Sequence, residues 1–137
     1  MERTFAIIKP DAVAAGHTGE IVAMIEAAGL KLSALRLHQL TVREAEGYYE
    51  EHRGKKFFDE LIAFMTEAPV VMMCLEGENA IVKWRDLMGA TDPAKAAAGT
   101  IRQKFGTNIG RNATHGSDGP PAAARELGWF FRGSEIL

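Results

Sequence analysis

The chain has 137 residues, of which 47% are hydrophobic and 25% are charged, and its formal net charge is −2. This length fits one domain with a substantial buried core, and the composition is ordinary for a soluble globular protein. The net negative charge argues against a nucleic-acid binder, and no stretch approaches the ~18 apolar residues of a membrane span. We therefore expect residues 1–137 to form a single domain with neither a nucleic-acid nor a membrane partner.

Hydrophobic periodicity and capping signals predict strands alternating with helices. In chain order they are a strand at 4–8, a helix at 18–28, a strand at 31–40, helices at 41–51 and 57–66, a strand at 69–75, and helices at 77–87 and 120–127. Thr41 and Glu44 have the spacing of a capping box. Residues 129–131 are expected to close the core. This order predicts an antiparallel α+β sheet with helices packed on one face.

The distribution of charge and the cysteine content bear on the class of ligand and on the cellular compartment. Residues 83–111 hold six basic and two acidic side chains, a net charge of +4, which leaves −6 for the rest. Such a segment suits a small polyanion, although a solvated basic face explains it equally well. The single cysteine, Cys74, excludes an intramolecular disulfide. The N-terminus lacks the apolar region of a signal peptide, so a cytoplasmic location is expected.

Residues 89–114 are long, glycine-containing and only patchily periodic. A segment of this kind inside a compact domain is more often functional than idle. The chain contains neither of the glycine-rich motifs that cradle phosphates, G-x-x-x-x-G-K-[ST] and G-x-G-x-x-G. Any phosphate must therefore be bound by side chains, and arginine suits this task because its planar guanidinium binds two oxygens at once.

The run Asn112 to Asp118 contains a histidine in an unusual setting. His115 is followed by Gly116, which leaves it open to a large ligand, and a neutral imidazole with a pKa near ~6.5 is a competent nucleophile. Lys9, Arg85 and Arg102 are candidate phosphate binders. These residues predict phosphoryl transfer through a phosphohistidine at His115.

The segment 112–118, Asn-Ala-Thr-His-Gly-Ser-Asp, resembles the active-site signature of nucleoside diphosphate kinases. Four more segments follow the order and spacing of that family, at 4–11, 57–58, 88–93 and 99–102, so the resemblance covers the whole chain. It implies a ferredoxin-like βαββαβ core with four antiparallel strands and an inserted loop at about 89–114. It also implies an enzyme that moves the γ-phosphoryl group of a nucleoside triphosphate to a nucleoside diphosphate. The implied mechanism is ping-pong, with little base specificity.

The resemblance implies roles for individual residues. Glu126 matches the carboxylate that orients the histidine, Ser117 is expected to support that carboxylate, and Tyr49 matches a tyrosine whose hydroxyl approaches the phosphohistidine. The matched nucleotide contacts are Lys9 at the transferred group, Arg85, Thr91 and Arg102 at the phosphates, Asn112 at the ribose and phosphate side, and Phe57 and Ile109 on either side of the base.

A magnesium ion, Mg²⁺, would bridge the donor's phosphates. Because Mg²⁺ usually keeps several waters, few protein ligands are needed and no dedicated protein metal site is expected. Members of the family assemble from a common dimer, so the resemblance implies a homo-oligomer, either a tetramer or a hexamer.

The chain departs from the family pattern at a few positions. Gly119 stands where serine is usual and is followed by Pro120 and Pro121, which should make the next helical turn stiffer and less polar and could alter the hydrogen bonding behind His115. Lys56 and Ala98 stand where prolines are frequent.

Two other function classes remain open. A regulatory ligand-binding module of the same fold would not explain why His115, Glu126 and Lys9 occur together with phosphate-type residues. A single-stranded nucleic-acid binder is weakly favoured by the basic segment, but the net charge and the absence of clustered strand aromatics oppose it.

Overall fold

The computed structural model describes every residue from Met1 to Leu137. Its elements follow in the order β1 (Glu2–Ile8), α1 (Pro10–Ala14), α2 (Thr18–Ala27), β2 (Lys31–His38), α3 (Val42–Tyr48), η1 (Glu50–His52), α4 (Phe58–Thr66), β3 (Val70–Gly77), α5 (Ala80–Met88), η2 (Pro93–Lys95), α6 (Ile101–Phe105), β4 (Thr114–Gly116), α7 (Pro120–Phe130) and η3 (Gly133–Glu135). None of these helices has the length and apolar character needed to cross a membrane.

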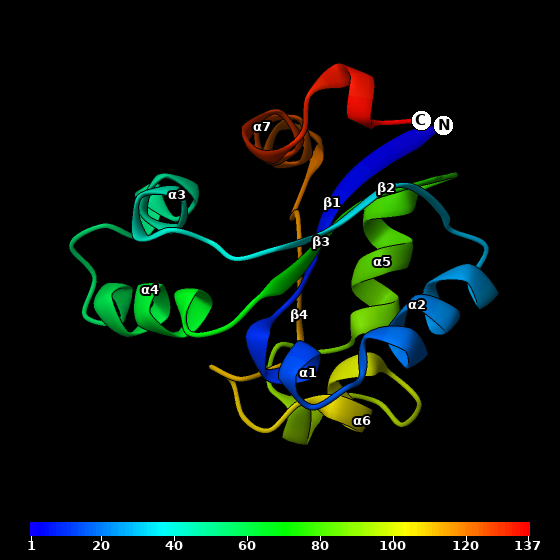
Figure 1. Cartoon of the computed structure of the whole chain (residues 1–137). Helices are drawn as coiled ribbons and strands as arrows, with labels where there is room; N and C mark the ends of the chain where they lie inside the picture. Colours follow the sequence, from blue (N-terminus) through cyan, green and yellow to red (C-terminus); the bar gives the residue numbers. More distant parts are fainter.

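The four strands form one sheet in the order β2-β3-β1-β4, and every neighbouring pair is antiparallel (Figure 1). The elements β1, α2, β2, β3, α5 and β4 make up the predicted βαββαβ core. The segment between α5 and β4 is the predicted insertion, and it contains η2 and α6. The ferredoxin-like α+β fold expected from the sequence is therefore confirmed.

Helices cover both faces of the sheet, not one face as the sequence analysis expected. Figure 1 shows α2 and α5 on one side of the strands and α3 and α4 on the other. Along β1, Phe5 and Ile7 join a core cluster with α3, α4 and α7, whereas Ala6 and Ile8 join a second cluster with α2 and α5. The physical reason is that β1 and β3 are nearly continuous apolar runs, and such strands must be buried on both faces.

The end of α7 also differs from the expectation. The helix continues through Gly128 to Phe130, although glycine inside a helix costs about 1 kcal/mol relative to alanine. Leu127 and Phe130 are buried on the sheet, and this packing carries the helix past the glycine. Trp129 was expected in the core but is 52% exposed, and its ring lies over Gly47.

The start of α7 explains how the chain accommodates its unusual Gly119-Pro120-Pro121 sequence. Gly119 is the N-cap and has no side chain that could accept a hydrogen bond from the first turn. The two prolines occupy the first helical positions and carry no N–H, so two of the donors that normally need a cap are absent. The missing cap therefore leaves few unsatisfied groups.

The predicted capping box at α3 is confirmed and provides a test of local stability. The Thr41 side chain accepts a hydrogen bond from the Glu44 N–H at 3.1 Å, and the Glu44 side chain accepts one from the Thr41 N–H at 2.9 Å. Thr41→Ala should therefore lower the free energy of unfolding by about 1 kcal/mol, measured by chemical denaturation. Thr18→Ala is the matched control, because α2 has no side-chain cap, and it should cause little loss. Equal losses in the two variants would contradict the capping role.

Candidate active site

His115 lies at the middle of β4, the shortest strand, where it is paired with Ile7 of β1. The strand is preceded by a tight turn at Ala113, whose φ of +74° is rare for a residue with a side chain. The N–H of Thr114 donates to the carbonyl of Asn112 at 2.9 Å, which closes a three-residue γ-turn. A strained turn of this kind costs about 1–3 kcal/mol and persists only where its surroundings hold it.

Two contacts hold the turn at Ala113 in place. Its N–H donates to Oδ2 of Asp11 at 3.1 Å, and its carbonyl accepts a hydrogen bond from the backbone N–H of Lys9 at 2.8 Å. Both partners belong to the junction between β1 and α1, so the N-terminal strand directly controls the position of the histidine strand.

The imidazole of His115 has one nitrogen directed at a carboxylate. Its Nε2 lies 3.4 Å from Oε1 of Glu126, which is on α7. The same oxygen accepts hydrogen bonds from the hydroxyls of Ser117, at 2.9 Å, and Tyr48, at 2.8 Å. Nδ1 makes no hydrogen bond within the protein, and the side chain is 26% exposed. The free nitrogen is therefore the one available to a ligand.

The surroundings of His115 keep its ring neutral. Burial lowers the pKa of the imidazole; the Glu126 carboxylate opposes this, while the positive charges of Lys9 and Arg102 lower the pKa further. Burial by itself would raise the pKa of the Glu126 carboxyl, but its hydrogen bonds to His115 and to the two hydroxyls outweigh burial and hold that pKa below its ordinary value. A neutral imidazole thus faces an ionised carboxylate at pH 7.

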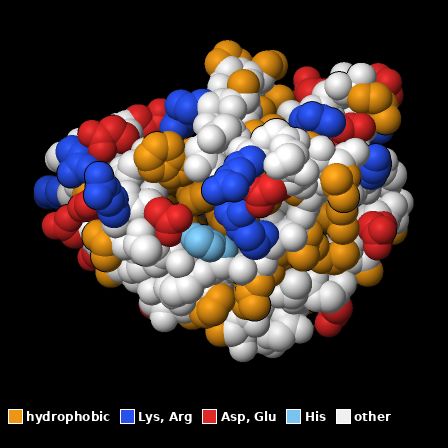
Figure 2. Space-filling view, turned by 45° about the horizontal axis from the view of Figure 1, so that its top comes forward, with side chains coloured by type: hydrophobic (Ala, Val, Ile, Leu, Met, Phe, Trp, Pro, Cys, Tyr) orange, Lys and Arg blue, Asp and Glu red, His pale blue; other side chains and the backbone are white.

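A cleft of about 760 Å³ opens above His115, and a second hollow of about 600 Å³ shares Lys9, Phe57 and Ile109 with it. Figure 2 shows Lys and Arg side chains gathered beside a histidine at a hollow of the surface. Nine of the predicted site residues line the larger cleft: Lys9, Phe57, Arg85, Thr91, Arg102, Ile109, Asn112, His115 and Glu126.

Lys9 and Asn112 form the buried side of the cleft. Nζ of Lys9 donates to Oδ1 of Asn112 at 2.9 Å, and Nδ2 of Asn112 donates to the carbonyl of Thr91 at 3.0 Å. Burial lowers the pKa of Lys9 to about 8, the positive charge of Arg102 lowers it as well, and Asp11 partly opposes both effects. A further negative charge in the cleft, in addition to that of Asp11, would therefore stabilise the protonated form of Lys9.

Arg102 is buried at the base of the insertion and ties it to the sheet. Its two terminal nitrogens donate to the carbonyls of Gly89, at 3.0 Å, and Thr114, at 2.9 Å, while its Nε has no partner. Burial and the neighbouring charge of Arg85 lower the pKa of its guanidinium to about 10. Each terminal nitrogen carries two N–H donors and uses one, so one donor on each remains for an anion in the cleft.

The outer part of the cleft is apolar. Phe57, the N-cap residue of α4, is 46% exposed, and Ile109, on the insertion, is 59% exposed, whereas the neighbouring Phe58 is only 6% exposed. Two adjacent phenylalanines at the start of a helix point in different directions, so one can face the cleft while the other packs in the core. Phe57 and Ile109 line both hollows, where they offer apolar surface to a planar group.

Comparisons with known proteins agree on one family. The family model described as nucleoside diphosphate kinase matches residues 2–136. The chain belongs to the nucleoside diphosphate kinase family. It is 56% identical to the nucleoside diphosphate kinase of Syntrophotalea carbinolica, with both chains covered completely. It is 54% identical to that of Sorangium cellulosum, covering 99% of this chain and 94% of the relative.

Solved structures of the family have the same fold. The nucleoside diphosphate kinase of Aquifex aeolicus superposes with a TM-score of 0.97 at 42% identity, covering 99% of both chains. The enzyme of Halobacterium salinarum, in complex with CDP, gives a TM-score of 0.96 at 42% identity, covering 99% of this chain and 91% of the other. The chain is thus a phosphotransferase, and the family reaction moves a phosphoryl group from a nucleoside triphosphate to a nucleoside diphosphate.

Two predicted site residues of this nucleoside diphosphate kinase lie outside the cleft lining. Ser117 is buried behind the histidine, where it donates to Glu126. Tyr49 is also buried; its ring centroid is 6.4 Å from that of His115, and its hydroxyl has no hydrogen-bond partner. The role of Tyr49 toward a phosphohistidine stays a prediction.

The structure adds residues to this kinase site that the sequence analysis did not select. Tyr48 reaches Glu126, Asp11 holds the turn before β4, and Trp84 donates from its indole Nε1 to the carbonyl of His115 at 3.2 Å. Asp11 stands in the matched Lys-Pro-Asp run, so its position was a usable signal. Tyr48 and Trp84 had no local signal, because their contacts join segments far apart in the chain.

No group of three or more His, Cys, Asp and Glu side chains is arranged to hold a metal ion in the structure. Lone carboxylates at the cleft, such as Asp118 and Glu51, provide at most single oxygen ligands. This donor set fits a divalent ion carried by the phosphates of a nucleotide, because Mg²⁺ is commonly bound by substrate phosphates and water with few carboxylates.

Gly116 has a different physical role from the one expected. The sequence analysis took it as leaving room for a ligand, but a Cβ at this position would lie 2.5 Å from Cδ1 of Trp84 and 2.8 Å from Cε of Met88. The glycine therefore allows β4 to pack closely on α5.

Gly116→Ala should destabilise the protein by about 1–3 kcal/mol through overpacking, measured as the free energy of unfolding. The matched control is Gly128→Ala on α7, where no atom lies within 4 Å of the added Cβ. That control should stabilise the protein by up to about 1 kcal/mol, because alanine is the better helix former. A neutral Gly116→Ala would show that Trp84 can move aside.

Proposed function

We propose that this member of the family carries the phosphoryl group on Nδ1 of His115, with no preference for one base. The observation that carries the proposal is the orientation of the ring. Nε2 lies against Glu126, and Nδ1 is left free at a cleft that also contains Lys9 and Arg102. A nucleophile, its orienting carboxylate and two buried cations form a set suited to phosphoryl transfer.

In the forward half-reaction the Nδ1 lone pair attacks the γ-phosphorus of the donor. The new bond is N–P, and the bond that breaks joins the γ-phosphorus to the bridging oxygen of the departing nucleoside diphosphate. The ring becomes cationic, and its Nε2–H donates to the Glu126 carboxylate, which stabilises the developing charge. In the second half-reaction a β-phosphate oxygen of another nucleoside diphosphate attacks the same phosphorus, and the neutral histidine is regenerated, as a ping-pong mechanism requires.

The basic side chains of the cleft have separate proposed roles. Lys9 pairs with the transferred group, because its buried ammonium needs a negative partner that Asn112 cannot supply. Arg85 and Arg102 bind the remaining phosphate oxygens, Thr91 contributes a hydroxyl, and Asn112 serves the ribose side. Each charge-assisted hydrogen bond of this kind stabilises the bound nucleotide by about 1.5–3 kcal/mol.

The base is proposed to stack between Phe57 and Ile109. Both side chains are exposed and apolar, and they belong to the outer part of the cleft. Stacking on an aromatic ring is worth about 1–3 kcal/mol and accepts any base, because each base has a π-face. The CDP bound to the Halobacterium salinarum relative supports a nucleoside diphosphate as ligand of such a cleft.

Mg²⁺ is the proposed metal; when bound to the donor's phosphates it would neutralise their negative charge. Asp118 and Glu51 are the nearest lone carboxylates that could contribute a direct or water-mediated ligand.

We further propose a homo-oligomer built from dimers, a tetramer or a hexamer, in the cytoplasm. In support, β2 is an edge strand that exposes the apolar Leu35 and Leu37, and such edges are usually covered. Sedimentation equilibrium distinguishes the two assemblies by mass.

His115→Ala should abolish covalent labelling by γ-labelled ATP and also phosphorylation of a nucleoside diphosphate. The label on the unaltered protein should be labile to acid and stable to base, as expected of a phosphohistidine. His17→Ala is the control: its ring packs on Phe105, away from the cleft, and labelling should persist. Normal turnover by the His115→Ala variant would contradict the proposed mechanism.

Phe57→Ala should weaken binding of purine and pyrimidine nucleotides together, by about 1–3 kcal/mol of lost stacking, with purines affected somewhat more. Its melting temperature should change little, because the ring is half exposed. Phe58→Ala is the matched comparison and should instead lose about 3–5 kcal/mol of stability. Isothermal titration with four nucleoside diphosphates and thermal unfolding measure the two effects. A large stability loss at Phe57 with unchanged affinity would assign it to the core.

A further inference from the structure

Tyr48 is the last residue of α3 and donates the shortest hydrogen bond that Glu126 receives. The distance from its hydroxyl to Oε1 is 2.8 Å, compared with 3.4 Å from Nε2 of His115 to the same oxygen. The side chain is buried, and the two partners are 78 positions apart in sequence. Nothing in the proposed mechanism so far uses this hydroxyl.

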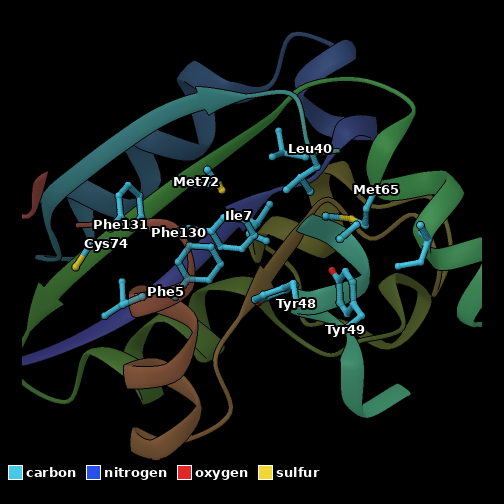
Figure 3. Packing of buried hydrophobic residues seen from close by; sticks show 14 of the residues in the cluster. Phe5, Ile7, Leu40, Tyr48, Tyr49, Met65, Met72, Cys74, Phe130 and Phe131 are labelled. Carbon is cyan, nitrogen blue, oxygen red and sulfur yellow. The ribbon is translucent and has the colours of Figure 1, made fainter. Parts of the chain in front are cut away.

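The aromatic core holds the Tyr48 ring in position. Its centroid lies 5.7 Å from that of Phe5 and 5.3 Å from that of Phe130, and it meets the His115 ring edge to face at 5.5 Å. Figure 3 shows Tyr48 and Tyr49 side by side at the end of α3, with Phe5 and Phe130 packed nearby. Because a phenol O–H lies in the ring plane, fixing the ring also fixes the direction of the donated bond.

Three donors converge on one carboxylate oxygen of Glu126. They are Tyr48, Ser117 and Nε2 of His115, while the other oxygen, Oε2, faces the half-exposed Arg125 at 3.6 Å. A carboxylate free to rotate would turn toward solvent and that arginine. The two hydroxyl bonds oppose the rotation, and the one from Tyr48 is the shorter.

We propose that Tyr48 is a positioning residue for phosphoryl transfer, which holds Oε1 of Glu126 against Nε2 of His115. The proposal rests on the proposed roles of His115 and Glu126 in the reaction. Tyr48 is not among the residues that line the cleft, so it would act only through the carboxylate.

The physical basis is preorganisation. As Nδ1 of His115 bonds to phosphorus, positive charge develops on the ring, and the interaction of Nε2–H with Oε1 strengthens. An acceptor already held in line needs no reorganisation at that moment. The Tyr48 bond also reduces the basicity of Oε1, so the proton remains on Nε2 while the phosphohistidine exists.

The neighbouring Tyr49 cannot do the same. Tyr49 is the C-cap residue just beyond α3, with non-helical backbone angles of φ −98° and ψ +24°, and its hydroxyl finds no protein partner, whereas Tyr48 reaches Glu126. Of two adjacent tyrosines, the structure therefore assigns support of the carboxylate to one only.

Tyr48→Phe tests the proposal because it removes only the hydroxyl. In single-turnover experiments with ATP and magnesium, the rate of His115 phosphorylation should fall by roughly 10- to 150-fold, the size expected for one hydrogen bond to a charged group. The apparent affinity for the donor should stay within about twofold, because no nucleotide contact is lost. A purely structural role would alter the melting temperature without this separation of rate from affinity.

A double-mutant cycle with Glu126→Ala tests whether Tyr48 acts through the Glu126 carboxylate. If Tyr48 acts through the carboxylate, Tyr48→Phe in the Glu126→Ala background should change the rate by less than about twofold. Ile62→Val is the control for a weakened core: it removes one methylene from the same core cluster but no hydrogen bond, and its phosphorylation rate should match that of the unaltered protein.

Two results would overturn the proposal. One is a Tyr48→Phe variant that phosphorylates His115 at the normal rate, and the other is an equal rate loss with and without the Glu126 carboxylate. Failure of the underlying mechanism looks different, because His115→Ala would then still be labelled.

Discussion

Burial of β1 on both faces is the constraint on which the rest of the structure depends. Phe5 and Ile7 pack into one core cluster and Ala6 and Ile8 into the other, while β3 and β4 occupy its two edges. With faces and edges all occupied, the strand cannot shift without disrupting both cores. Lys9 follows the last residue of this strand, and His115 is paired with Ile7. The cation and the histidine of the cleft are therefore positioned by the same core.

The cleft concentrates buried positive charge at Lys9 and Arg102. Burial lowers the pKa of both Lys9 and Arg102, and Nε of Arg102 has no hydrogen-bond partner. The buried carboxylate of Glu126 is engaged by the histidine and two hydroxyls, and Asp11 only partly offsets the positive charge at Lys9. Buried cations without matching anions are costly, and a polyphosphate is the type of ligand that relieves this cost. The same buried cations therefore lower the stability of the fold and favour the binding of a phosphate.

Local patterns predicted three of the four strands and the helices α2, α3, α4, α5 and α7, because these elements and the capping box at Thr41 are set by residues near one another in the chain. They missed α1, α6 and the strand β4, which are only three to five residues long and show too little periodicity. Local patterns predicted less well on which face of the sheet each helix lies and where α7 ends. Placing all helices on one face overlooked the near-continuous apolar runs of β1 and β3. Ending α7 before Gly128 gave local propensity more weight than the burial of Phe130 on the sheet. In both cases tertiary packing outweighed the local signal.

By itself, the sequence determined the family, most of the longer elements and nine of the residues that line the cleft, because these follow from periodicity and from motifs read within short segments. Only the tertiary structure decided which nitrogen of His115 faces Glu126, that Gly116 makes room for Trp84, and that Tyr48, not Tyr49, reaches the carboxylate. These outcomes depend on side chains brought together from distant segments and on the rotation of α3, and no local pattern distinguishes two adjacent tyrosines.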